Sequence, residues 1–199
     1  RLAESPGAGS LRILRDLPLS EYEILLNNPQ FCNLRELHLD SHNLSGELLD
    51  RFLGCKHFQN LEILKFGRGA WTESRIATFI KKDWSKLRVL QLDGCELDDE
   101  CVAQLVKCPT FTNLHSLGLD NNRITGEGFG AIVGSKYLRN VRCLSVDSNS
   151  LRGLPKKAFQ KTEMLLWTFN ASYAQFTQAD LKTLSESDLL RELVWLSMG

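Results

Sequence analysis

One spacing of apolar residues recurs along most of the chain. Apolar side chains occupy relative positions 1, 4, 6 and usually 11 of units that begin at residues 34, 61, 87, 114, 141, 164 and 190. The clearest copy is LHSLGLDNNRI, residues 114–124. Because side chains two apart in a strand share a face, positions 4 and 6 predict a short strand with one buried face. A weaker unit at residues 11–33 is expected to cap the array, and residues 1–10 to be a tail or disordered.

The second half of each unit changes to a helical period. In DDECVAQLVKC, the residues Cys101, Val102 and Leu105 fall on one stripe of a predicted helix. Similar stripes occur in residues 48–53, 76–80 and 129–133. Units are expected to close with an apolar side chain that returns to the core before the next strand: Phe31, Phe58, Phe111 and Leu138.

Two units depart from this pattern. The fifth is four residues shorter and has Pro155 where a long helix would begin, so a compact, turn-rich connection and a change of curvature are expected. The sixth is unusually apolar, with Met164, Trp167 and Phe169 taken as positions 1, 4 and 6. The chain stops within the seventh unit, which is predicted either to continue in a longer parent or to expose an apolar end.

These units resemble the leucine-rich-repeat family, whose pattern is LxxLxLxxN/CxL, and the length near 27 residues is similar to the ribonuclease-inhibitor-like subclass. The resemblance spans residues 11–199 and implies an α/β solenoid, a horseshoe with a concave parallel β-sheet and convex α-helices, in one domain. At position 9 the family has Asn or Cys, which satisfies the backbone of neighbouring coils. This chain has His42, Gly69, Cys95, Asn122, Asn149 and Ser172 there.

Position 7 carries a column of aspartates. Strand alternation directs positions 2, 3, 5, 7 and 8 toward the concave side or its rims. Carboxylates on adjacent strands would lie about 5 Å apart and would repel unless water or a cation intervenes. Two interpretations stay open: each Asp accepts a hydrogen bond from the backbone N–H two residues on, or the column is an acidic strip that recognises basic groups. The column is Asp40, Asp93, Asp120 and Asp147.

Position 2 is mostly basic and forms a second stripe of opposite sign. These arginines either solvate the sheet edge or contact a partner. At the C-terminal end, Leu165, Leu166, Val194 and Leu196 fall at expected concave positions, and such an apolar patch is typical of an interaction site. The candidate partner-binding residues are Asp40, Asp93, Asp120, Asp147, Arg35, Arg88, Arg142, His38, Lys65, Leu166 and Val194.

Charge and composition exclude several partner classes. The chain has 24 Lys+Arg and 24 Asp+Glu, so it has no overall field that would hold nucleic acid or an anionic membrane. No apolar run approaches the roughly 20 residues that span a bilayer. A protein partner is therefore predicted, with no nucleic acid and no membrane.

The six cysteines occur in no CxxC or Cys/His ligand spacing, so no zinc site is predicted. Free cysteine behaves as a small apolar residue, which favours reduced core thiols and a cytoplasmic location. The triplets at Asn43 and Asn170 match the N-glycosylation sequon, and they keep a secreted or cell-surface location as the alternative.

No catalytic constellation emerges from the sequence. The four histidines do not pair with a Cys or Ser at nucleophile-like spacing, and TGEGFG, residues 125–130, lacks the spacing of a phosphate-binding loop. The sequence thus predicts a non-enzymatic protein-interaction scaffold, without cofactor or metal, that binds its partner on the concave face. The alternative is the recognition arm of a larger multidomain enzyme, effector or immune-type receptor whose chemistry lies elsewhere.

Overall fold

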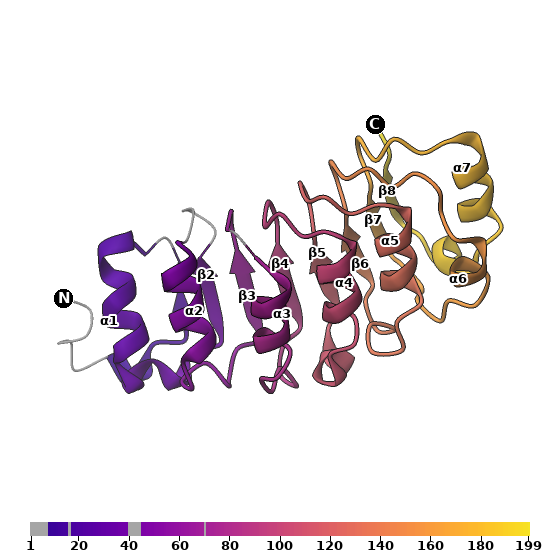
Figure 1. Cartoon of the computed structure of the whole chain (residues 1–199). Coiled ribbons are helices and arrows are strands. Elements are labelled where there is room, and N and C mark those ends of the chain that lie inside the picture. The colour runs from indigo at the N-terminus through magenta and orange to yellow at the C-terminus, as the bar shows by residue number, and fades with distance from the viewer. Residues whose placement is uncertain (1–7, 16, 40–44, 70) are drawn as a thin grey trace.

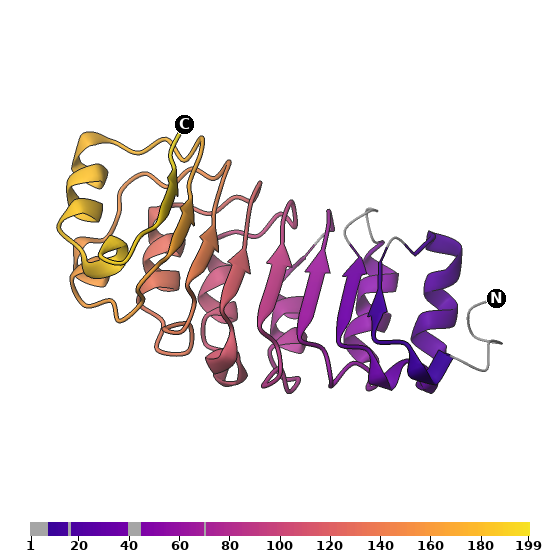
Figure 2. The same ribbon diagram turned by 180° about the vertical axis from the view of Figure 1, so that it is seen from behind.

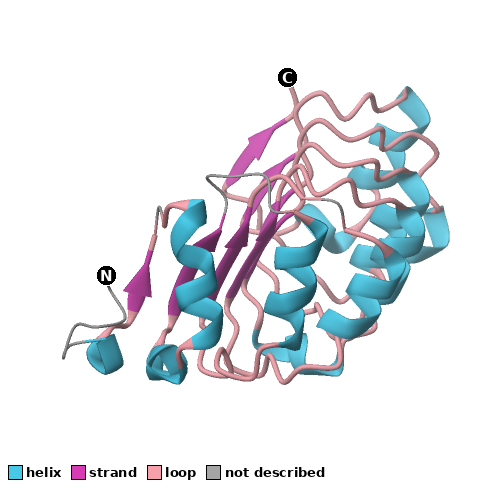
Figure 3. Ribbon diagram, turned by 60° about the vertical axis from the view of Figure 1, so that its left-hand side comes forward, coloured by secondary structure: helices cyan, strands magenta, loops and turns pink. Residues whose placement is uncertain are grey.

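A computed structural model describes residues 8–15, 17–39, 45–69 and 71–199. Its eight strands are all parallel and pair in chain order in one open sheet (Figure 2). The helices lie together on one face of that sheet (Figures 1 and 3). The opposite face is named the concave face below. The strands are β1 (Ile13–Leu14), β2 (Glu36–Leu39), β3 (Ile63–Phe66), β4 (Val89–Leu92), β5 (Ser116–Gly118), β6 (Cys143–Ser145), β7 (Thr168–Asn170) and β8 (Trp195–Ser197).

Each strand from β1 to β7 is followed by a convex segment that contains a helix or a turn of 3-10 helix. The α-helices are α1 (Tyr22–Asn27), α2 (Gly46–Gly54), α3 (Glu73–Phe79), α4 (Asp99–Leu105), α5 (Gly126–Val133), α6 (Lys156–Gln160) and α7 (Gln178–Ser185). The 3-10 turns are η2 (Ala8–Ser10), η3 (Leu19–Glu21), η4 (Pro29–Asn33), η5 (Pro109–Asn113) and η6 (Asp188–Leu190).

The core is one continuous layer between the sheet and the helices. Position 4 of each unit is in register with position 4 of the next, and these side chains are at most 2% exposed: Leu37, Leu64, Leu90, Leu117, Leu144 and Phe169. Phe31, Phe58, Phe111 and Leu138 also return to this core, as predicted. The architecture is an α/β leucine-rich-repeat solenoid.

The predicted register is wrong in the last two units. Leu144 pairs with Phe169, so Phe169 is position 4 and the sixth unit begins at Leu166 rather than at residue 164. Phe169 in turn pairs with Leu196, which moves the start of the seventh unit from residue 190 to Leu193. Several consecutive apolar residues make more than one frame compatible with the leucine pattern, and the pairing selects the frame that buries Leu166, Phe169 and Ala171.

Asn122 and Asn149, both at position 9, connect neighbouring coils through their amide groups. Oδ1 of Asn122 accepts from the backbone N–H of Leu97 at 3.0 Å, and Nδ2 donates to the carbonyls of Leu92 and Leu119 at 2.9 Å. Asn149 repeats this arrangement one coil later, with Ile124 as its donor. Both side chains are buried, so their predicted scaffold role is confirmed.

Other position-9 residues fulfil this role only in part. The thiol of Cys95 lies 3.3 Å from the carbonyl oxygen of Gly67 and donates to it. His42 lies outside the described residues. With the corrected register Ser172 is at position 7, and Ala174 takes position 9 of the sixth unit.

A second asparagine series links the closing turns, at the position before the first leucine of a unit, named position 0. Each Nδ2 donates to a backbone carbonyl of the preceding coil at 2.7–2.9 Å, which satisfies a turn carbonyl without helix or strand pairing. The members and their acceptors are Asn33 with Gly9, Asn60 with Cys32, Asn113 with Ser85, and Asn140 with Thr112.

Most of the α-helices begin at side-chain caps, and α1 and α6 do not. A hydroxyl or carboxylate accepts a backbone N–H at the start of five helices, at Ser45, Thr72, Asp98, Thr125 and Thr177. TGEGFG is therefore the start of α5. Its glycines are required by packing, because a Cβ at Gly126 would collide with the carbonyl of Arg152, and one at Gly128 with the carboxylate of Asp99.

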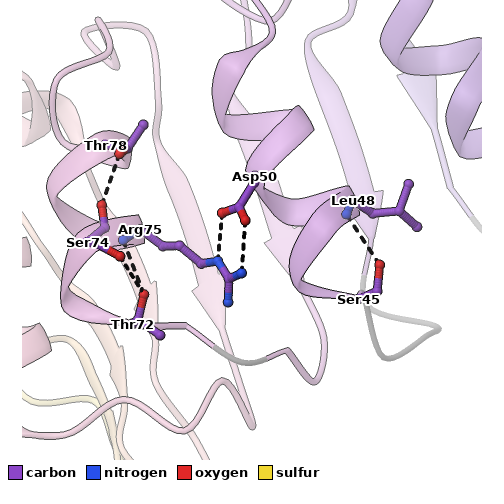
Figure 4. A network of polar contacts seen from close by, with 7 residues as sticks. All are labelled: Ser45, Leu48, Asp50, Thr72, Ser74, Arg75 and Thr78. Carbon is purple, nitrogen blue, oxygen red and sulfur yellow. Dashed lines mark hydrogen bonds and ion pairs between the residues drawn. The ribbon is translucent and has the colours of Figure 1, made fainter.

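Side chains also connect adjacent helices across the convex face. Figure 4 shows that Arg75 of α3 donates two hydrogen bonds to the carboxylate of Asp50 on α2. They run from Nε to Oδ1 at 2.7 Å and from Nη2 to Oδ2 at 3.0 Å. The hydrogen bond from Arg75 lowers the pKa of Asp50 below its ordinary value. The pair is largely exposed on the Asp50 side, so it contributes little to stability and serves mainly to align the two helices.

The fifth unit has the short convex segment that Pro155 predicts, since α6 has only five residues. Buried Asp180 at the start of α7 holds this segment by accepting from the backbone N–H of Gly153 at 3.1 Å and of Leu154 at 2.9 Å. Burial by itself raises the pKa of Asp180. The hydrogen bonds from Leu154, Thr177 and Gly153 outweigh burial, and the pKa lies below its ordinary value.

The start of the described chain belongs to the solenoid. The segment 11–33 contains β1, which pairs with β2, and α1. The expectation of a tail through residue 10 is wrong for Ala8–Ser10, which form a 3-10 turn bonded through Gly9 to Asn33.

All six cysteines are free thiols, as predicted. Cys32 is exposed, Cys143 is half-buried, and the rest are buried. Burial raises the pKa of Cys101 to about 11 and raises those of Cys95 and Cys108 as well. Asn170 of the second sequon is the last residue of β7, and its side chain bonds to Ser145 and Ser172.

We expect a thiol reagent to discriminate among these cysteines in the native protein. Because the thiolate is the reactive form, Cys32 should be modified first and Cys143 next, while Cys95 and Cys101 react only as the protein unfolds. Peptide mapping by mass spectrometry after timed modification measures this order, and denatured protein should yield six thiols. Modification of Cys95 as fast as Cys32 would contradict the described packing.

Candidate partner-binding face

The concave face consists of two rows of side chains that cross the strands. Position 3 supplies Ile13, Glu36, Ile63, Val89, Ser116, Cys143, Thr168 and Trp195. Position 5 supplies His38, Lys65, Gln91, Gly118, Ser145, Asn170 and Ser197. The N-terminal half thus has longer and charged side chains, and the floor over β5–β7 has small, mostly polar ones.

The three described aspartates at position 7 form a series between coils. Oδ1 of Asp93 accepts from the backbone N–H of Asp120 at 3.0 Å, and Oδ1 of Asp120 accepts from the backbone N–H of Asp147 at 2.9 Å. For Asp120, the interpretation as a turn closed by the N–H two residues on is therefore wrong, because its carboxylate accepts from Ser145 and Asp147 of the next coil. The carboxylates of Asp93 and Asp120 bond to the next strand, where they satisfy an N–H at the end of the sheet ladder. Asp40 lies outside the described residues.

Asp120 is the most constrained of these carboxylates. Ser145 donates its hydroxyl to Oδ1 of Asp120 at 2.5 Å. Burial raises the pKa of Asp120, the hydrogen bonds from Ser145 and Asp147 act in the opposite direction, and the charge of Asp147 adds to the rise. The net pKa is above the ordinary value, so the ionised carboxylate is not fully compensated. Repulsion between the carboxylates of Asp120 and Asp147 raises the pKa of Asp120 less than burial does.

The predicted basic rim is present at the opposite ends of the strands. Arg35 and Arg88 are exposed, and Nη1 of Arg35 contacts Oε1 of Glu62 at 3.0 Å. Nη1 of Arg142 instead donates to the carbonyls of Arg139 and Val141 at 2.9 and 3.0 Å. The aspartates and arginines thus lie on opposite rims, as the alternation predicts.

His38 and Lys65 are paired neighbours on β2 and β3. Nε2 of His38 lies 2.8 Å from Oε1 of Glu36, although not in hydrogen-bond geometry. Arg15 contacts the same oxygen through Nε at 2.8 Å and Nη2 at 2.5 Å. Glu36 is buried beside Arg15 and His38, and its contact with Arg15 links β2 to the segment after β1, a role that its sequence position alone does not reveal.

The apolar patch at the C-terminal end differs from the prediction. Leu166 is fully buried because it is position 1 of its unit, so it is not a surface candidate. Val194 is 85% exposed and lies beside Trp195, which is 52% exposed on the concave face. The exposed patch therefore includes a tryptophan that the misplaced register assigned to the core.

The candidate residues predicted from the sequence did not include Arg12 and Lys86, which lie near Arg35 at the basic rim. Arg12 could have been recognised from the sequence, because it occupies position 2 of its unit as Arg35 does. Lys86 stands at position 0, where the two units on either side of it have Asn.

Other kinds of site are not evident in the described part of the chain. There, no three His, Cys, Asp or Glu side chains come together in a way that could hold a metal ion. No helix in it has both the length and the apolar character needed to cross a bilayer.

Asp120→Asn should leave the protein as stable as the parent, or slightly more stable, at neutral pH. The amide oxygen still accepts from Ser145 and Asp147, and the poorly compensated charge is gone. A raised folded-state pKa means that Asp120 stabilises the fold most when protonated and loses this contribution as pH rises through that pKa. The melting-temperature advantage of the variant should therefore grow from acidic to neutral pH. Thermal melts across this range measure it, and an advantage that shrinks as pH rises would contradict the assignment.

Neither a protein-family model nor a curated protein sequence matches the chain. Among solved structures, the fold is similar to an internalin (inlF) from Listeria monocytogenes at 17% identity and TM-score 0.49, covering 86% of this chain and 63% of that one. It is also similar to the C-terminal domain of tropomodulin from Caenorhabditis elegans at 15% identity and TM-score 0.44, covering 86% and 93%. The chain spans under two thirds of the internalin. The fold assignment rests on strand order, register and the position-9 hydrogen bonds.

Proposed function

We propose that this chain is a non-catalytic protein-interaction module whose concave face binds a partner protein. The observation that carries the proposal is that the helices cover one face of the sheet and leave the other open (Figure 2). Parallel sheets are normally covered on both faces. Ile63 and Val89 on this face are half-buried, and Trp195 is exposed, so apolar surface remains for a partner to cover.

The two charged rims support a protein as the occupant. Asp93, Asp120 and Asp147 mark one side of the face, and Arg35, Arg88 and Arg142 mark the other. A partner with complementary groups on two edges is held in one orientation by this arrangement, because like charges disfavour the reversed one. His38, Lys65 and Val194 lie on the same face or at its rim and complete the proposed contact surface. The balanced total charge gives no corresponding advantage to a polyanion.

The test replaces Asp93, Asp120 and Asp147 together with Asn. Amide oxygens keep the hydrogen bonds to the next strand, so the fold should persist, while the acidic rim is lost. A partner isolated by affinity capture and then prepared pure should bind this variant about tenfold more weakly, roughly 1.4 kcal/mol. Titration calorimetry with the parent protein and the variant measures the difference.

A matched control neutralises three carboxylates on convex helices: Asp50→Asn, Glu100→Gln and Glu127→Gln. This variant loses the same charge from the face that the proposal leaves unused, and it should bind as the parent does. Loss of binding in the convex variant with full binding in the concave variant would place the interface on the helices and refute the proposal.

A further inference from the structure

Three cations gather in a depression at the N-terminal ends of β1–β4. The depression has a volume of about 290 Å³. Its lining among the described residues consists of Arg12, Asn33, Arg35, Asn60, Glu62 and Lys86. Glu62 is the only carboxylate in that set and contacts Arg35, so positive charge remains in excess. All three cationic side chains are solvent-exposed.

Lys86 occupies position 0 of its unit, which places it in this depression. The neighbouring units have Asn at that position. Its counterparts donate their amides to a carbonyl of the preceding coil. Lys86 instead directs Nζ to Oδ1 of Asn60 at 2.5 Å. Nδ2 of Asn60 is already used in the series, so Asn60 connects Lys86 to the scaffold. The chain thus has a charged group at a position where an uncharged amide serves the fold elsewhere.

The backbone N–H groups that lead into β2–β4 are used by the sheet. The carbonyl of Arg12 accepts from the N–H groups of Arg35 and Glu36, and that of Arg35 accepts from Glu62 and Ile63, at 2.7–3.0 Å. In the next coil, the carbonyl of Glu62 accepts from the N–H groups of Arg88 and Val89 in the same way. An anion in the depression therefore finds these N–H groups occupied and meets the side chains of Arg12, Arg35 and Lys86.

We propose that this depression binds an acidic segment of the partner protein, in an extended conformation across the N-terminal ends of β1–β4. The inference rests on the proposed function and names the chemistry of one part of the partner. Arg12, Arg35 and Lys86 belong to coils that span three strand spacings, about 15 Å in all. About five extended residues cover this distance at 3.3 Å per residue, so carboxylates on several residues match the cations.

This spread of charge disfavours a single phosphate group. Compact phosphate sites depend on convergent donors, commonly backbone N–H groups at a helix N-terminus, whereas this rim is formed by strand starts whose N–H groups at Arg35, Glu62 and Arg88 are occupied by the sheet. Nucleic acid is disfavoured as well, because none of the described lining residues is an aromatic side chain on which a base could stack.

The direct test uses a fluorescent peptide that alternates glutamate with serine, and a matched peptide with glutamine in place of glutamate. Fluorescence anisotropy at low and at high salt measures binding to the full chain. The glutamate peptide should bind and weaken with salt, and the glutamine peptide should not bind. The double variant Arg35→Gln/Lys86→Gln should weaken binding by about tenfold, whereas Arg123→Gln/Lys161→Gln, which removes two exposed cations elsewhere, should not.

Three results would overturn the inference: no binding of the glutamate peptide, equal binding by both double variants, or displacement of the peptide by inorganic phosphate at concentrations where chloride has no effect. The proposed function is tested separately from this inference. If the peptide does not bind but the triple aspartate variant still loses the isolated partner, the concave face remains the interface and only the acidic-segment inference is wrong. Circular dichroism of each variant confirms that lost binding is not lost folding.

Discussion

The buried amides of Asn122 and Asn149 connect one coil of this solenoid to the next, and the arrangement of the other side chains depends on that connection. A short strand leaves backbone groups unpaired where it turns toward the helix, and burying them without partners costs free energy. Each asparagine supplies one acceptor and two donors at this point. Because a coil contacts mainly its neighbours, such bonds stabilise the array one interface at a time.

The concave face uses the same solution with charged groups. Asp93 and Asp120 each extend a carboxylate to the N–H of the following strand, which satisfies the backbone beyond the sheet ladder. Asparagine would do this without a charge. Asp120 is half-buried and its ionised form is costly, so the carboxylate contributes more to the surface than to stability. The position-0 series shows the same contrast, since Lys86 adds a cation where Asn113 and Asn140 bond only to backbone carbonyls.

Much of this fold could be predicted from local spacing. Regular leucines at positions 4 and 6 define the frame wherever polar residues flank them, and this holds from Leu37 to Val146. The predicted register was wrong in MLLWTF and ELVWLS, because several consecutive apolar residues there are compatible with more than one register. There the choice depends on pairing with the previous strand, which is a non-local contact.

The candidate face was only partly predictable for a similar reason. Strand alternation placed the aspartates and arginines on opposite rims, but it did not show where the carboxylates of Asp93 and Asp120 find their donors. Those donors lie 27 residues on. The depression around Lys86 and Arg12 likewise forms only when separate coils stack. Pattern within a unit predicts orientation, whereas contacts between units decide hydrogen bonding and charge balance.

Residue-resolved hydrogen exchange on Asn122→Ala tests the role of the amide series most directly. The variant should lose roughly 1 to 3 kcal/mol of stability, because buried backbone groups lose their partners. Exchange should identify which groups: the amide of Leu97, which donates to Asn122, should lose more protection than the amide of Ile124, whose acceptor Asn149 is intact. A Leu97 amide that stays as protected as in the parent protein would show that Asn122 does not hold the coils together.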